Sequence, residues 1–394
     1  MKKISEIFLN ISIAVISFIL IFCLLEVSAN IYLLYWANEA RFVRYASWQQ
    51  LQKRRKMSNP QYSPHRYIGY YPTPNYVNGK NRHNSYGYRG KNIAIPKPNE
   101  QFRIFCLGGS TTYTYNGAAA DYGESWPDLI EKYLIEKGIK NVQVINAGAD
   151  GWSSWESLID LELKILDLEP DMIIIYHGIN DIHPRFVWPQ EAYRGDNSGR
   201  RAFGNLSFMP SMLEYSTLLR ILMIRAGLIA PHAAFDRTID ENIPDSFYGN
   251  LFIKQKNEGV YPQGIFKDIS ALKMLKTNTP VYFERNIRNM IAIAKNYGVK
   301  IVISSFAYSS LFTPLVEVSS EEYIFAHEEN NLLLKRISED TGVYFFDFAS
   351  KFPKSKRYYY DGRHVNLEGA KLQAEFFGNF LIENRLISSS NEPN

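Results

Sequence analysis

The sequence predicts an α/β protein built on a doubly wound, five-stranded parallel sheet. Two observations lead to this prediction. Five short apolar runs of strand length lie between residues 102 and 346, and segments with helical spacing of apolar residues separate them. Strands that alternate with helices in this way imply right-handed βαβ units and a sheet covered on both faces. We place this domain at residues 101–388.

The predicted strands are FRIFCL (102–107), VQVI (142–145), MIIIY (172–176), KIVIS (300–304) and VYFF (343–346). The helices between and after them are predicted at 125–138, 153–168, 280–297, 321–340 and 366–385. In the first helix, Ser125 and Asp128 have the spacing of a capping box and Gly138 marks the end.

The N-terminus predicts a membrane segment. Residues 7–25 contain no charge, and 19 apolar-rich residues are about enough to cross the hydrocarbon core as a helix. The aromatic residues of IYLLYW (31–36) suit a membrane–water interface. A cleaved signal peptide is the alternative, because residues 27–29 resemble a small-x-small cleavage site. The length of the apolar stretch favours a retained anchor over residues 1–36.

Whether the segment is an anchor or a signal peptide, it sends the rest of the chain across the membrane if the basic N-terminus stays in the cytoplasm. Arg41, Arg44 and the cluster KRRK (53–56) oppose this orientation, but large domains translocate largely regardless of charge. We therefore expect a single-pass protein with its domain outside the cytoplasm. A secreted or periplasmic protein is the expectation if the segment is cleaved.

Composition excludes several classes of function. The net charge of +4 is slight and gives no reason to expect nucleic acid as a partner. Two cysteines cannot form a disulfide framework or a cysteine-based metal site. No His, Asp and Glu residues have metal-ligand spacing, and LGGST (107–111) lacks the lysine of a phosphate-binding loop. We predict neither a metal nor a cofactor.

Two segments interrupt or precede the predicted alternation. Residues 37–100 lack periodicity and are interpreted as a neck and an extended segment. Residues 182–278 form an insertion after the third strand, longer than an ordinary connection. Within it, residues 212–230 are apolar apart from three charged residues. We favour a helix packed on the core, with a cap over the active site or a membrane-touching helix as alternatives.

Polar residues follow four of the five strands. In an open parallel sheet, ligands bind beyond the carboxyl ends of the strands. These ends carry Gly108-Gly109-Ser110, NAGADG (146–151), HGIND (177–181) and DGRH (361–364). A serine attacks once a histidine takes its proton, a carboxylate can orient that histidine, and glycine N–H and asparagine amide groups can stabilise an oxyanion. The pattern favours a nucleophile at Ser110 over a plain turn.

The blocks LGGST, NAGADG, GIND and DGRH, in this order, resemble the SGNH hydrolase superfamily, also called GDSL esterases/lipases. The matches run across residues 102–385. The resemblance implies the flavodoxin-like SGNH hydrolase fold. It also implies a membrane-anchored bacterial branch, in which the first block reads Gly-Gly-Ser-Thr and a segment like NSYGYRG (84–90) precedes the nucleophile.

The same resemblance assigns roles to individual residues. Ser110 is the implied nucleophile, His364 the general base and Asp361 its partner. The implied oxyanion donors are the N–H of Ser110, the N–H of Gly151 and the side chain of Asn180. Gly148 is the alternative to Gly151, and Asp347 the alternative to Asp361. Gly109 stands where the family usually has the aspartate of Gly-Asp-Ser.

These features predict a membrane-anchored, extracytoplasmic serine ester hydrolase. Its expected substrates are acyl esters, often acetyl esters, on cell-envelope carbohydrate or lipid. One alternative is an O-acyltransferase that uses the same triad on a polysaccharide. Another is a non-catalytic envelope assembly protein, which the intact set of Ser, Asp and His disfavours. How the insertion covers the site decides between water and sugar as acceptor.

Overall fold

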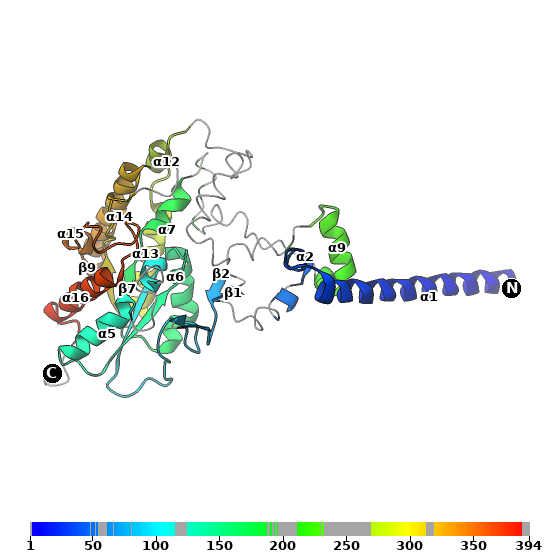
Figure 1. The fold of residues 1–394 in the computed structure, drawn as a ribbon, viewed down its shortest axis with the longest axis horizontal. Helices are drawn as coiled ribbons and strands as arrows, with labels where there is room; N and C mark the ends of the chain where they lie inside the picture. Colours follow the sequence, from blue (N-terminus) through cyan, green and yellow to red (C-terminus); the bar gives the residue numbers. More distant parts are fainter. Residues whose placement is uncertain are drawn as a thin grey trace. The chain divides into compact units, whose positions relative to one another are not determined.

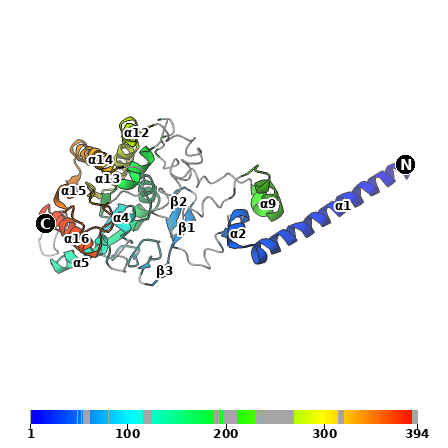
Figure 2. The same ribbon diagram turned by 45° about the horizontal axis from the view of Figure 1, so that its top comes forward.

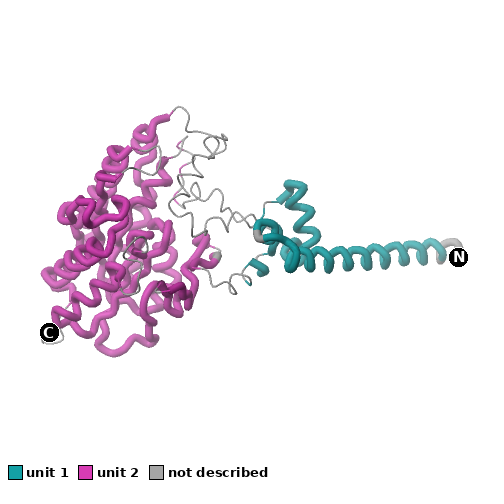
Figure 3. Tube along the Cα trace, viewed as in Figure 1, with its two compact units in different colours: residues 1–60, 203–240 teal, residues 61–202, 241–394 magenta. Residues whose placement is uncertain are grey.

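The computed structural model describes residues 2–47, 49–51, 53, 61–65, 67–79, 81–114, 124–186, 190, 193, 195, 211–229, 231, 269–312 and 319–387. The chain forms two compact units, which are described separately (Figure 3). The smaller unit combines residues 1–60 with 203–240, and the larger combines 61–202 with 241–394. Most of the predicted insertion 182–278 lies outside the described residues.

The larger unit contains the predicted five-stranded parallel sheet, which confirms the fold class (Figures 1 and 2). Its strand order is β6-β5-β7-β8-β9, the flavodoxin-like order in which the first two strands exchange places. The strands are β5 (Phe102–Gly108), β6 (Val142–Gly148), β7 (Met172–Tyr176), β8 (Lys300–Ser304) and β9 (Tyr344–Phe346).

Strand β6 continues three residues beyond the predicted end at residue 145. Asn146, Ala147 and Gly148 pair with the last three residues of β5, so the polar start of NAGADG is still part of the sheet. Gly108 pairs with Gly148 on one side and with Tyr176 on the other. Three neighbouring strands therefore end at one level, and their following loops begin side by side.

Helices cover both faces of this sheet. The helices in the described part of this unit are α4 (Ser110–Tyr113), α5 (Trp126–Glu136), α6 (Ser154–Asp160), α7 (Ile179–Ile182), α12 (Ala271–Thr277), α13 (Val281–Asn296), α14 (Ser320–Thr341), α15 (Phe348–Lys351) and α16 (Leu367–Glu383). Three short turns, η3 (Leu161–Ile165), η4 (Leu166–Leu168) and η5 (His183–Arg185), extend α6 and α7. The side chain of Ser125 caps α5 by accepting from the N–H of Asp128, as predicted.

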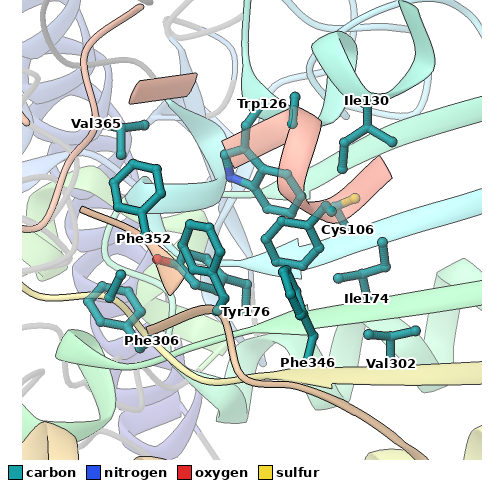
Figure 4. Close-up of a cluster of buried hydrophobic side chains, with 14 of the residues drawn as sticks. Cys106, Trp126, Ile130, Ile174, Tyr176, Val302, Phe306, Phe346, Phe352 and Val365 are labelled. Atoms are coloured by element: carbon teal, nitrogen blue, oxygen red, sulfur yellow. The ribbon is translucent and has the colours of Figure 1, made fainter. Parts of the chain in front are cut away.

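Alternate residues of each strand face opposite layers of helices. In β5, Ile104 and Cys106 pack in a cluster with α5 and α16, where Trp126 is fully buried (Figure 4). Phe105 and Leu107 pack in a second cluster with α6 and α13. Both faces are therefore apolar, which explains why the strands are continuous apolar runs in the sequence.

Residues 61–91 are more regular than an extended segment. They form two short antiparallel pairs, β1 (Tyr62–His65) with β2 (Gly69–Pro72) and β3 (Val77–Asn78) with β4 (Asn81–Arg82). An isolated bridge then joins Arg89 to Asn146 of β6. The segment before the sheet is thus hydrogen-bonded to the strand edge that carries NAGADG.

The smaller unit is built on a long apolar helix. It consists of α1 (Lys2–Ile31), a π-helical turn η1 (Tyr32–Trp36), α2 (Glu39–Tyr45), α8 (Ser211–Tyr215) and α9 (Thr217–Arg225). Residues 6–36 are long and apolar enough to span a membrane, a property that signal sequences share. The expectation that residues 212–230 form a helix packed on the core of the predicted domain is wrong, because α8 and α9 belong to the smaller unit, where α9 packs on α1 and α2.

Glu26 of α1 holds the start of α9. Its carboxylate accepts hydrogen bonds from the N–H of Thr217 at 2.6 Å, the N–H of Leu218 at 3.0 Å and the hydroxyl of Ser216 at 2.7 Å. The first N–H groups of a helix have no partner within the helix. A glutamate 190 residues earlier in the chain thus supplies the acceptor that α9 needs.

Replacing Glu26 by Ala should loosen α9. Loss of a side-chain cap typically costs about 1 kcal/mol, so amide hydrogens of residues 217–225 should exchange several-fold faster in the full-length protein. Hydrogen exchange followed by mass spectrometry measures this. The matched control is Glu6→Ala, which removes an exposed glutamate from the same helix and should change nothing in α9. Unchanged exchange in Glu26→Ala would contradict the cap.

Candidate active site

Four predicted loops meet at the carboxyl edge of the sheet. Ser110 lies two residues after the end of β5 at Gly108 and opens the single-turn helix α4, with Gly109 as its N-cap. The loops after β6 and β7 begin beside it because Gly148 and Tyr176 pair with Gly108. The Ser110 side chain is half-buried among the residues that the structure describes.

A chain of hydrogen bonds joins three of the predicted residues. The Ser110 Oγ lies 2.7 Å from Nε2 of His364. On the other side of the ring, Nδ1 of His364 lies 2.7 Å from Oδ2 of Asp361. Ser110 and His364 are 254 residues apart in the chain, so the fold alone brings them together.

The electrostatics of Asp361 keep it ionised. Burial alone would raise the pKa of this carboxyl. The charges of His364 and Arg363, with the hydrogen bonds from His364, outweigh burial and hold the pKa well below its ordinary value. Nε of Arg363 lies 3.5 Å from Oδ2 of Asp361. Asp361 is therefore a carboxylate at any pH at which an ester would be turned over.

The loop that carries Asp361 and His364 is fixed by its own backbone. The N–H groups of Arg363 and His364 donate to Oδ1 of Asp361 at 3.1 and 2.8 Å. Gly362 has φ = 87°, a region that favours glycine, and its carbonyl accepts from the N–H of Ser309. A Cβ at residue 362 would lie 2.5 Å from the carbonyl oxygen of Ser309. The glycine in DGRH is therefore required by this close approach.

Asp347, the alternative acid, is engaged elsewhere. Its Oδ1 accepts a hydrogen bond of 2.9 Å from the hydroxyl of Ser305, and the residue precedes α15. His364 is hydrogen-bonded to Asp361 instead. Among the residues that the structure describes, no three His, Cys, Asp or Glu side chains gather as metal ligands.

Asn180 and Gly151 lie on the loops beside Ser110. One N–H of the Asn180 amide donates to the carbonyl of Trp152 at 2.8 Å, which ties the loop after β7 to the loop after β6. The N–H of Gly148, the alternative to Gly151, donates to Oδ1 of Asn146 at 3.0 Å. That bond commits the Gly148 N–H to the strand end.

Gly109 permits the close approach of these loops. A Cβ at residue 109 would lie 2.4 Å from Nδ2 of Asn180 and 2.7 Å from the carbonyl oxygen of Trp152. Real Cβ atoms do not approach other heavy atoms so closely, so any side chain at this position would displace Asn180 or Trp152. The departure from Gly-Asp-Ser therefore matches the local packing of this chain.

A buried carboxylate next to Asn180 connects the same two loops. Asp181 accepts from the N–H of Ser154 at 3.0 Å and from its hydroxyl at 2.5 Å. The Ser154 hydroxyl also accepts from Nδ2 of Asn286 on α13 at 3.0 Å. Nδ1 of His177 lies 3.6 Å from Asp181, but burial lowers the pKa of His177 to about 3, so the ring is neutral.

Arg89 holds the far end of α4, a role that the sequence did not reveal. Its guanidinium is buried and donates to the carbonyls of Tyr113 and Thr114 at 2.5 and 2.7 Å. Asn146 donates to the carbonyl of Thr112 at 2.9 Å. These bonds satisfy carbonyls at the end of the short helix that begins with Ser110. The feature of the sequence that drew attention to Arg89 was its place in the segment NSYGYRG (84–90).

A doubly wound sheet with hydrogen-bonded Ser, His and Asp side chains at its carboxyl edge is the arrangement typical of α/β serine hydrolases. The sequence model of the GDSL-like Lipase/Acylhydrolase family matches residues 106–372. The chain belongs to this family and is by class an ester-hydrolysing enzyme. This confirms the resemblance to GDSL esterases/lipases.

Solved structures of low sequence identity are also similar. A lipase/acylhydrolase from Enterococcus faecalis is 15% identical to this chain, with a TM-score of 0.41. The match covers 72% of this chain and 97% of the Enterococcus faecalis chain. A GDSL-like lipase from Bacteroides thetaiotaomicron is 12% identical with a TM-score of 0.40, covering 75% and 93%. An acetyl xylan esterase is 11% identical with a TM-score of 0.39, covering 71% and 100%. No curated protein matches the chain.

Restoring the usual Gly-Asp-Ser motif should harm this enzyme. Gly109→Asp places a Cβ against Asn180 and Trp152, so kcat/KM for a short-chain aryl ester should fall at least about tenfold, since small displacements at a reacting centre are costly. Gly109→Ala adds the Cβ without the charge, so its kcat/KM should fall by a similar factor if packing is the cause. Steady-state kinetics measures both. Wild-type or higher activity in Gly109→Asp would show that the packing argument is wrong.

Asp181→Asn should weaken catalysis through Asn180. The amide keeps one oxygen for the N–H and hydroxyl of Ser154, but its NH2 group replaces Oδ2 and opposes the Ser154 N–H, which lies 3.2 Å from Oδ2, so the two loops should shift. We expect kcat to fall by about 10- to 100-fold with a smaller change in KM. Asp167→Asn, at an exposed position, is the control. A variant that loses thermal stability but keeps its kcat would assign Asp181 to stability alone.

Proposed function

We propose that this protein is a membrane-anchored, extracytoplasmic serine esterase that removes acyl groups, acetyl groups above all, from cell-envelope carbohydrate or lipid. The observation that carries the proposal is the unbroken hydrogen-bond chain from Ser110 through His364 to Asp361. Family membership supports ester chemistry at this site. The extracytoplasmic location that we propose would bring envelope esters within reach of the site.

Each residue of the chain has a defined part in the reaction. Ser110 Oγ attacks the ester carbonyl while Nε2 of His364 accepts its proton, which requires the other ring proton to lie on Nδ1. Asp361 accepts that Nδ1 proton in a hydrogen bond and stabilises the imidazolium. His364 then protonates the leaving alcohol. Water, deprotonated by His364, attacks the acyl-enzyme and releases the acid.

The oxyanion of each tetrahedral intermediate needs fixed donors. We assign these to the N–H groups of Ser110 and Gly151 and to the second N–H of the Asn180 amide. The first N–H of that amide is bonded to Trp152, which fixes its orientation. Donors held in place before the reaction cost no reorganisation when charge develops.

The position of Ser110 favours water as the acyl acceptor. Its side chain is half-buried rather than enclosed among the described residues, which supports access of water to the acyl-enzyme. A transferase would have to exclude water from this intermediate. An O-acyltransferase acting on a polysaccharide is the second candidate, since the same triad would serve both reactions.

The contacts of α1 support a retained anchor. Cleavage after Ala29 would remove Glu26, which holds the start of α9, and would leave these N–H groups without their acceptor. The contact of Glu26 with α9 therefore supports retention of the segment as an anchor over its removal as a signal.

Ser110→Ala should abolish hydrolysis, because a methyl group cannot attack a carbonyl. The fall in kcat should reach about 10³-fold or more, while the thermal midpoint stays near the wild-type value. Turnover of a short-chain aryl ester and thermal unfolding measure the two quantities. The control Ser350→Ala alters an exposed hydroxyl and should leave both unchanged. Wild-type turnover in Ser110→Ala would remove this residue from the mechanism.

The acyl-enzyme should be hydrolysed whether or not a sugar is present. The test forms the intermediate with an aryl acetate and follows its decay in water alone and in water with an acetyl-free oligosaccharide. Equal decay rates and free acetate are expected. Decay that accelerates many-fold, with acetyl groups appearing on the sugar, would establish the transferase instead.

A further inference from the structure

A closed network of polar side chains surrounds the break between α8 and α9 in the smaller unit. Glu26 accepts from the start of α9, as described above. Arg220, 1% exposed, donates from all of its N–H groups: to the carbonyls of Tyr45, Leu213 and Glu214 and to side chains of Gln50 and Thr217. Backbone N–H groups at the start of α9 and carbonyls at the end of α8 thus find hydrogen-bond partners inside the unit.

Such internal satisfaction is what a helix break requires in the absence of water. In a lipid environment each unpaired N–H or C=O costs several kcal/mol, so irregular backbone is tolerated only where the protein itself provides partners. At an aqueous surface, either water or side-chain caps serve these groups. The network makes these helix ends independent of water, as a location in the bilayer interface requires.

The depth of α9 follows from its contact with Glu26. That residue comes directly after the uncharged stretch 7–25, so it marks the level at which the apolar part of α1 ends. Helix α9 begins at this level. Tyr35 and Trp36, 77% and 78% exposed, lie at the same end of α1 and suit a membrane–water interface.

The outward surface of α8 and α9 is apolar. Met212, Tyr215, Leu222 and Leu228 are exposed large hydrophobic residues on this short segment. The exposed side chains of Arg41, Arg44 and Arg225 lie in the same unit. Apolar side chains accompanied by arginines match the boundary between acyl chains and anionic headgroups.

We propose that residues 211–229 form a second membrane contact, in which α8 and α9 lie in the interfacial layer of the bilayer beside α1. The ligand is the lipid surface, acyl chains against the apolar residues and headgroup phosphates against the arginines. Helix α9 packs on α1 within one compact unit, and both helices carry exposed apolar residues, which argues for lipid as the occupant of this surface. This inference rests on the proposal that α1 is a membrane anchor.

Single-cysteine probes in the full-length protein test this contact. The purified protein is reconstituted in vesicles of phosphatidylcholine and phosphatidylglycerol and labelled with an environment-sensitive fluorophore. The native Cys23, exposed on α1, reports insertion of the anchor, and Cys106 is fully buried. In a Cys23→Ser background, Leu222→Cys and Leu228→Cys report the proposed contact. Leu163→Cys is the matched control, because Leu163 is an exposed leucine of the larger unit, 60% exposed against 52% for Leu222.

Spin-labelled lipids should quench the probes at positions 23, 222 and 228 by half or more, and aqueous iodide should quench the probe at 163. If position 23 is quenched by lipid while 222 and 228 behave like 163, the inference is overturned and the anchor stands. If position 23 is not quenched either, the membrane anchor itself is wrong.

Discussion

The pairing of Gly108 with both Gly148 and Tyr176 is the constraint on which the rest of the site depends. It ends three parallel strands at one level, so the loops after them start at one edge. Ser110 stands two residues past that level. A shift of register by one residue would turn every following side chain to the other face of the sheet. The apolar clusters on both faces oppose such a shift.

Polar contacts then fix the loops that the strands bring together. The Asn180 amide and the Asp181 carboxylate each bind the loop after β6, through Trp152 and Ser154. Arg89 and Asn146 hold the carbonyls at the other end of the nucleophile helix. These groups are buried, so leaving any of them unpaired would be costly. The same contacts that satisfy them also position the donors for an oxyanion before any substrate arrives.

Much of this architecture could be predicted from local sequence. Apolar strands buried on both faces are readily recognised, and four of the five matched to within a residue, whereas β6 continued because Asn146 pairs across the sheet. The residues around Ser110 were identified from blocks that follow the strands. The bonds of Arg89 and the Ser154–Asp181 contact were not predictable, since neither has a periodic pattern. Likewise, hydropathy could not show that α9 pairs with Glu26, because that contact joins residues 190 positions apart.

The central claim is that Ser110 is the nucleophile activated by His364, and covalent labelling tests it most directly. The full-length protein is treated with a fluorophosphonate, which phosphonylates an activated serine, and the adduct is located by peptide mass spectrometry. The account predicts one adduct per chain, on Ser110, with labelling lost in His364→Ala. An adduct on another residue, or undiminished labelling of Ser110 in His364→Ala, would contradict it.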